Sequence, residues 1–123
     1  MTTTEPRTPD QLADAAAEAV RALAHATLSR PAAGWQYPDE ARNVVANLAI
    51  LAERLPQALG QVESFIGAHE DAGRLRSEHG PDDLAQRLLA FHGAVAGAIR
   101  HARALEAALG RAHQSLGAVS STE

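Results

Sequence analysis

The chain has 123 residues, of which 46% are hydrophobic and only 3% are aromatic, and its formal net charge is −4. This length fits one domain, and because most of the apolar residues are Ala and Leu, which favour helices, a β-sheet is not expected. The acidic balance argues against a nucleic-acid-binding protein, and the absence of Cys excludes a disulfide framework, a zinc ribbon and a thiol nucleophile.

A first helix is predicted from about residue 9 to about residue 28. Thr8 can cap it, proline suits its first position, and Gln11 completes a capping box. Pro31 follows its end. Residues 1–7 are polar, so we predict a disordered tail there, with neither a signal peptide nor a membrane span, and we expect a cytoplasmic protein.

The only Trp and the only Tyr of the chain, Trp35 and Tyr37, lie two residues apart in the segment SRPAAGWQYPDE, which we predict to be a loop. One hypothesis is that both anchor a partner, since Trp and Tyr are enriched at interface hot spots. The alternative is that Trp35 folds back as a plug over the end of the bundle. We favour the plug, because an end lined only by Ala and Leu has space for a large ring.

A second helix is predicted from about residue 38 to about residue 75, with acids in its first turn, where the helix dipole favours them. Its apolar residues recur at alternating steps of three and four, which is the heptad pattern of a coiled coil. These seam positions are Ala41, Val44, Leu48, Leu51, Leu55, Ala58, Val62, Phe65, His69 and Ala72. Pro56 interrupts the hydrogen bonds of this helix, so we expect either a kink or a split, and we favour the kink because the heptad phase continues.

A third helix is predicted from about residue 81 to about residue 117. Its seam positions are Leu84, Leu88, Phe91, Val95, Ala98, Ala102, Leu105, Leu109, Ala112 and Leu116. A short polar segment would join the two long helices as an antiparallel hairpin. Matching the seams sets residue i opposite about 156 − i. The resulting pairs are Phe65 with Phe91, Val62 with Val95 and Ala58 with Ala98.

The predicted fold is all-α: a long antiparallel hairpin with the shorter first helix packed on it as a three-helix bundle, within residues 8–118, before a disordered tail at 119–123. The first helix would cover a second stripe beside the seams, formed by Val45, Ala49, Ala52, Leu59 and Ile66 on the second helix and by Leu89, Ala96 and Ile99 on the third. At about 30 Å it is too short to reach the far end of the hairpin. Ile66 and Leu89 should therefore remain exposed to solvent, and exposed apolar patches of this kind mark interfaces.

Four glycines inside the long helices lie near the exposed far end of the hairpin, around Ile66 and Leu89. Gly60 and Gly67 lie one heptad apart, and Gly93 and Gly97 form a GxxxG pattern. Small residues let another helix approach closely, although each helical Gly costs about 1 kcal/mol relative to Ala. Codon bias in a high-GC genome is the alternative, since every basic residue is Arg. The predicted self-association interface comprises Gly60, Ile66, Gly67, Leu89, Gly93 and Gly97.

No motif predicts catalysis, a metal site or a cofactor. No two His residues have the spacing of a helical zinc motif, and acidic residues such as Glu63 and Glu70 fall on positions predicted to face outward. Arg100, Arg103 and Arg111 project from the outer face of the third helix. They form either a solvated face or a contact for nucleic acid.

The segment LAHATLSRPAAGWQYPDEARNVVANLAILAERLPQALGQ, together with most of the chain, resembles small uncharacterised helical proteins of streptomycetes and related actinobacteria. The resemblance implies a source in these bacteria and a place on mobile or accessory elements, and it implies no activity. WXG100 secretion substrates also combine helices with a Trp-containing loop. Here the order is Gly34-Trp35-Gln36 and a third long helix follows, so we reject that family.

We therefore expect a non-enzymatic helical module for protein–protein interaction or adaptor function, which forms a homodimer through the distal half of the hairpin or docks another helical protein. No membrane partner is expected. The alternative is a nucleic-acid-associated or regulatory accessory protein of an actinobacterial mobile element, acting through Arg100, Arg103 and Arg111.

Overall fold

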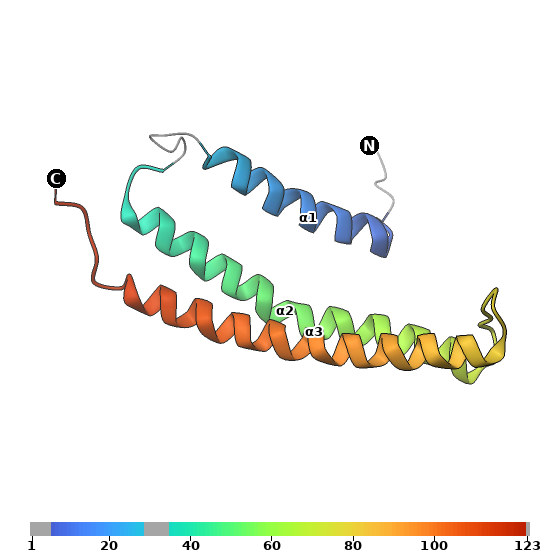
Figure 1. Ribbon diagram of the computed structural model, residues 1–123. Helices are drawn as coiled ribbons and strands as arrows, with labels where there is room; N and C mark the ends of the chain where they lie inside the picture. The colour runs from blue at the N-terminus through green and yellow to red at the C-terminus, as the bar shows by residue number, and fades with distance from the viewer. Residues whose placement is uncertain (1–5, 29–34, 123) are drawn as a thin grey trace. The chain divides into compact units, whose positions relative to one another are not determined.

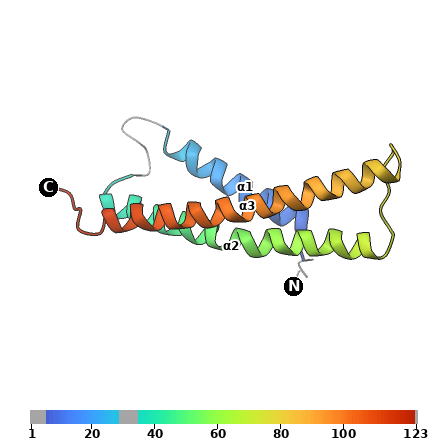
Figure 2. The same ribbon diagram turned by 60° about the horizontal axis from the view of Figure 1, so that its bottom comes forward.

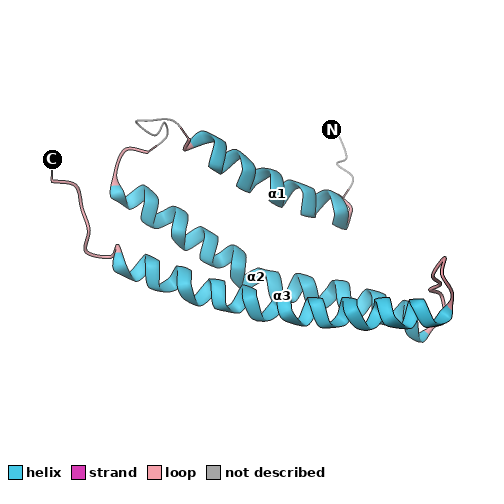
Figure 3. Cartoon of the chain, in the orientation of Figure 1, coloured by secondary structure: helices cyan, strands magenta, loops and turns pink. Residues whose placement is uncertain are grey.

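The structure is a computed structural model that describes residues 6–28 and 35–122. These residues form three helices and no strand: α1 Pro9–Ala26, α2 Pro38–Asp71 and α3 Pro81–Ser115 (Figures 1 and 3). The predicted all-α fold is confirmed, and the predicted helices run two to four residues too far at their C-terminal ends. None of these helices combines the length and the hydropathy that crossing a membrane requires.

The predicted tails are described only in part. Residues 1–5 and residue 123 lie outside the described residues, whereas residues 119–122 carry no secondary structure. The chain divides into two compact units, Met1–Tyr37 and Pro38–Glu123. α1 belongs to the first unit, and its packing on the hairpin as the third helix of a bundle stays a prediction.

The capping box predicted at the start of α1 is confirmed. The Gln11 N–H donates to the Thr8 hydroxyl oxygen at 3.4 Å, and the Thr8 N–H donates to the Gln11 side-chain oxygen at 3.0 Å. A carboxylate oxygen of Asp10 also accepts from the Gln11 N–H, at 3.0 Å. These bonds engage N–H groups that the first turn of a helix leaves without an intrahelical partner.

The second unit is an antiparallel hairpin of α2 and α3, whose arms run side by side in both views (Figures 1 and 2). α2 continues through Pro56 as one helix and bends near its middle (Figure 1). Proline has no N–H to bond the carbonyl of Ala52, four residues earlier, and its ring crowds that carbonyl. The prediction of a kinked, continuous helix is therefore confirmed.

Two glycines with positive φ reverse the chain between the arms. Arg74 donates its N–H to the His69 carbonyl at 3.0 Å, across Gly73, whose φ is 67°. This is a Schellman motif, in which a glycine in the left-handed region closes the helix end. Gly80, with a φ of 99°, comes directly before α3. α2 therefore stops before residue 75, where the sequence predicted its end.

The arms meet along a different stripe of α2 from the predicted one. The buried hydrophobic residues of the described chain are Ala52, Val95 and Ala102. The predicted seam residues Leu55, Val62 and Phe65 are 37%, 50% and 62% exposed. The prediction that these three residues face α3 is wrong. The predicted contact of Ala58 with Ala98 is wrong too, since both are exposed.

Two long-range contacts set the register of the hairpin. The Arg42 guanidinium donates to the Gly117 carbonyl at 3.1 Å, and His92 bonds to both Glu63 and Glu70. Both contacts place residue i of α2 opposite about 159 − i of α3, which is three residues away from the predicted register. The stripe that faces α3 is the one predicted to lie under α1, with Ala52 fully buried in it.

Replacing Ala52 by Leu should lower the free energy of unfolding by about 1–3 kcal/mol, because the larger side chain has no room between the arms. The same replacement at Ala68, which is exposed on α2, should change it by less than about 0.5 kcal/mol. Urea denaturation followed by circular dichroism measures both variants. Equal losses of unfolding free energy at the two positions would contradict the burial of Ala52 against α3.

Candidate functional site

One histidine joins the two arms near the turn. His92 of α3 places its Nδ1 atom 3.0 Å from Oε2 of Glu63 and its Nε2 atom 3.1 Å from Oε1 of Glu70, both on α2. When the ring is protonated, both of its nitrogens donate to these carboxylates, which only accept hydrogen bonds when they are ionised. The hydrogen bonds to Glu70 and Glu63 raise the pKa of His92 above its ordinary value.

The His92 cluster corrects the prediction that Glu63 and Glu70 face outward. Both carboxylates bond to α3, and all three side chains are partly shielded. The two carboxylates meet opposite nitrogens of the ring, so the three groups do not converge on one point. Within residues 6–28 and 35–122, no group of His, Asp or Glu is placed to hold a metal ion.

Helical geometry divides the surface of the hairpin into two sides. On each arm, the residue directly before an interface position projects to one side, and the residue directly after it projects to the other. In an antiparallel pair of helices, the residues that come directly before the interface positions of one arm lie on the same side of the hairpin as the corresponding residues of the other arm. Glu63 and His92 bond across the interface, so both are interface positions. Pro56, one heptad before Glu63, and Glu106, two heptads after His92, are half-buried interface positions too.

Large apolar side chains gather on one of these sides. Leu55, Val62 and Leu105 each come directly before one of the interface positions. Phe65 follows Val62 by three residues and so lies on the same side of α2. Leu105 is 47% exposed, and the α2 residues are exposed to a similar degree. We define the apolar face as Leu51, Leu55, Ala58, Val62 and Phe65 of α2 with Leu105 of α3.

The apolar face crosses a part of the hairpin that has almost no charge. Residues 55–69 of α2 and 88–99 of α3 contain one Asp, Glu, Lys or Arg, which is Glu63, whereas 21% of the whole chain is charged. In the observed register, residues 60–69 lie opposite residues 90–99, and residues 55–59 lie opposite the stretch that contains Arg100 and Arg103. We call these two segments the uncharged belt. Its one carboxylate is bonded to His92 inside the hairpin. Depletion of charge is typical of the cores of protein interfaces.

The residues of the predicted interface fall at several places in the belt. Leu89 is 76% exposed, whereas Ile66 is half-buried on the stripe that faces α3. Gly60, Gly67 and Gly97 are half-buried, and Gly93 is exposed. A Cβ atom on Gly60, Gly67 or Gly93 would meet nothing within 4 Å. No neighbouring group in the described chain therefore requires these three glycines, and their role in self-association stays a prediction.

The outer position of Leu55, Val62 and Phe65 was not predicted from the sequence. All three belong to a regular heptad pattern, which also suits a buried seam. The signal that distinguishes the two stripes of α2 is polar: Glu63 and Glu70 lie one heptad apart, and the histidine of the opposite arm can bond to both. That pairing puts the neighbouring apolar stripe outside the hairpin.

The two aromatic residues of the predicted loop differ in exposure. Trp35 is half-buried, and Tyr37 is 61% exposed. Both belong to the first compact unit, and residues 29–34 of the same predicted loop lie outside the described residues. The plug and the anchor both stay predictions.

The three arginines of the predicted nucleic-acid contact are exposed. Arg100, Arg103 and Arg111 project from one side of α3, over a length of about 16 Å. Three cations on a chain of net charge −4 give a small electrostatic footprint for phosphate. Binding of nucleic acid through them stays a prediction.

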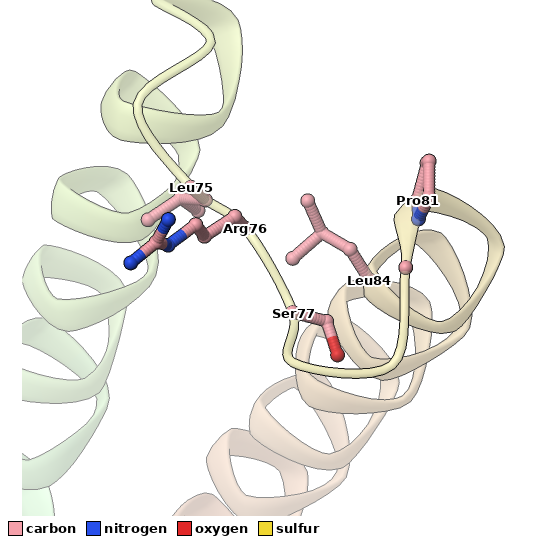
Figure 4. A pocket seen from close by; sticks show the side chains of 6 residues that line it. Leu75, Arg76, Ser77, Pro81 and Leu84 are labelled. Atoms are coloured by element: carbon pink, nitrogen blue, oxygen red, sulfur yellow. The ribbon is translucent and has the colours of Figure 1, made fainter.

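An open hollow of about 220 Å³ lies beside the turn and is lined by Leu75, Arg76, Ser77, Gly80, Pro81 and Leu84. Figure 4 shows Leu84 projecting from α3 toward the turn. The lining holds one ionisable side chain, Arg76. This hollow therefore has no acid and base pair that could transfer a proton.

Replacing His92 by Gln should remove a pH-dependent part of the stability of the hairpin. Because the pKa of His92 is raised in the folded protein, the charged ring stabilises the fold fully below its ordinary pKa and ceases to do so as the pH rises through the folded value. The melting temperature of the natural protein should therefore fall between about pH 6 and pH 9 more steeply than that of His92→Gln.

His101→Gln is the matched control, because His101 is an exposed residue of the same helix. Thermal unfolding followed by circular dichroism across this pH range measures the three proteins. If His92→Gln loses as much stability with rising pH as the natural chain, the bonds of His92 do not stabilise the hairpin.

The plug hypothesis predicts that Trp35 fluoresces further to the blue in the folded protein than in the urea-unfolded chain, with weak quenching by acrylamide. Trp35 is the only Trp, so the signal comes from one position. An emission maximum that unfolding leaves unchanged would contradict the plug and support the anchor.

The proposed function is based on the hairpin alone, because no known protein provides a comparison. Its distinguishing features are the partly shielded cluster of His92 with Glu63 and Glu70 between the arms and a charge-poor apolar surface beside it. No protein-family model, curated protein or solved structure matches the chain.

Proposed function

We propose that the protein is a non-enzymatic helical interaction module that self-associates through the uncharged belt of its hairpin. The observation that carries this proposal is the exposure of Val62 and Phe65 in a region whose one carboxylate is bonded to His92 within the hairpin. Burying apolar surface is favourable by about 25 cal/mol per Å². Association would therefore gain free energy without desolvating a free charge.

The small core of the hairpin supports the same function. The buried hydrophobic residues of the described chain are two alanines and one valine. A pair of helices packs along one stripe of each, and a further apolar stripe normally contacts another element. The apolar face of α2 is such a stripe, and a partner helix is the element that suits it.

We infer that the working form is a homodimer in the cytoplasm and that the function is assembly, either of copies of the chain or with another helical protein on the same surface. The chain has no Cys, which suits a reducing compartment.

Phe65→Glu tests this function. The natural chain should elute with twice the 12.9 kDa mass of one copy when light scattering is coupled to gel filtration at tens of micromolar. A carboxylate at position 65 would be buried without a partner, which costs at least about 2–3 kcal/mol and so raises the dissociation constant about 100-fold.

Ser64→Glu is the matched control, because it adds the same charge at the neighbouring exposed residue, outside the apolar face. This variant should remain dimeric. A natural chain that is monomeric at tens of micromolar would refute self-association, and equal dissociation of the two variants would assign the effect of Phe65→Glu to net charge.

A further inference from the structure

We propose that two copies pair α2 against α2 in antiparallel orientation, with their apolar faces in contact and a two-fold axis near residue 60. This inference rests on the proposed self-association and names its surface, its occupant and its direction. The product is a four-helix assembly in which the two α2 helices lie inside and the two α3 helices lie outside.

The length of the apolar stripe of α2 calls for an occupant beyond the first helix of the same chain. α2 has 34 residues and α1 has 18, which correspond to about 51 Å and about 27 Å of helix. Even if α1 docks on α2, about half of the stripe remains uncovered. A second copy of α2 has the required length.

The apolar face is complementary to itself about residue 60. In antiparallel heptad pairing, Leu55 of one copy meets Phe65 of the other, and Ala58 of one copy meets Val62 of the other. Each pair joins a larger side chain to a smaller one, so the contact surfaces can interdigitate. Leu105 lies on the same side of the hairpin as Leu55, so Phe65 of the other copy can insert between them as a buried anchor.

The edge of the apolar face suits a contact between identical chains. The residues that flank the stripe away from α3 are Asn47, Arg54, Gln61 and Ala68. Arg54 is the one charged member. A two-fold axis near residue 60 separates the two Arg54 residues by about 18 Å along the helices, which exceeds the screening length of about 8 Å at physiological salt. The two Arg54 guanidinium groups therefore do not repel each other at the centre of the contact.

The area of the contact corresponds to a weak dimer. A helix with its side chains is about 10 Å wide, and a two-fold axis near residue 60 sets residues 49–71 of the two α2 helices against each other over about 35 Å, which gives a footprint on the order of 350 Å² per copy. The total of about 700 Å² is smaller than a standard interface and is typical of a weak, transient one. The opposite side of the hairpin has less apolar surface, because Leu89 is accompanied there by Gly60, Gly67 and Arg103.

Distances between spin labels test the direction of pairing. The chain has no Cys, so Asn43→Cys and Gln61→Cys each carry one label, and both positions are exposed. They are 18 residues apart, which is five full turns, so both labels lie on the same flank of α2. Antiparallel pairing predicts an intermolecular distance of about 50 Å for position 43 and less than about 25 Å for position 61.

Electron–electron double resonance on the full chain measures both distances. Similar short distances at both positions would indicate parallel pairing and overturn the proposed direction while leaving self-association intact. The absence of any intermolecular distance at tens of micromolar would overturn the self-association itself.

Charge insertion tests the surface independently of direction. Val62→Glu should raise the dissociation constant about 100-fold, and Leu89→Glu should leave the dimer intact, because Leu89 lies on the other side of the hairpin. A dimer that survives Val62→Glu and dissociates in Leu89→Glu would overturn the apolar face as the contact.

Discussion

A pair of helices can bury only one stripe of each helix, and α2 carries two apolar stripes side by side. This constraint governs the rest of the hairpin. The stripe that contains Ala52 packs against α3, so the stripe that contains Val62 and Phe65 is left at the surface. A helix with two apolar stripes needs two neighbours. The hairpin supplies one neighbour, and the proposed second copy supplies the other.

A polar contact identifies which of the two stripes of α2 faces α3. His92 bonds to Glu63 and Glu70 only when their stripe faces α3, and these bonds also fix how far one arm slides along the other. Alanine and leucine pack in many registers with similar free energies, whereas a partly shielded carboxylate left without its partner is costly. The polar cluster therefore selects one arrangement from several that the apolar residues allow.

Local features of the fold could be predicted from the sequence because they depend on neighbouring residues. The capping box at Thr8, the bend at Pro56 and the start of α3 at Pro81 each follow from one or two side chains. The facing stripe of α2 could not be predicted from periodicity, since both stripes repeat with the same heptad spacing. For the same reason, the exposed residues Leu55, Val62 and Phe65 were assigned to the interior. Of the two large apolar residues of the predicted interface, Leu89 is exposed and Ile66 is half-buried.

The turn at Gly73 also determines the order in which the arms can come together. Bonds beside the turn close short segments of chain: Ser77 with Asp83 spans six residues, and His92 with Glu70 spans 22. The bond between Arg42 and Gly117 at the other end spans 75 residues. Loop-closure entropy rises with the length of the loop, and each contact formed shortens the loop that the next one must close. We therefore expect the arms to pair from the turn outward, and thermal opening to begin at the end where Arg42 bonds to Gly117.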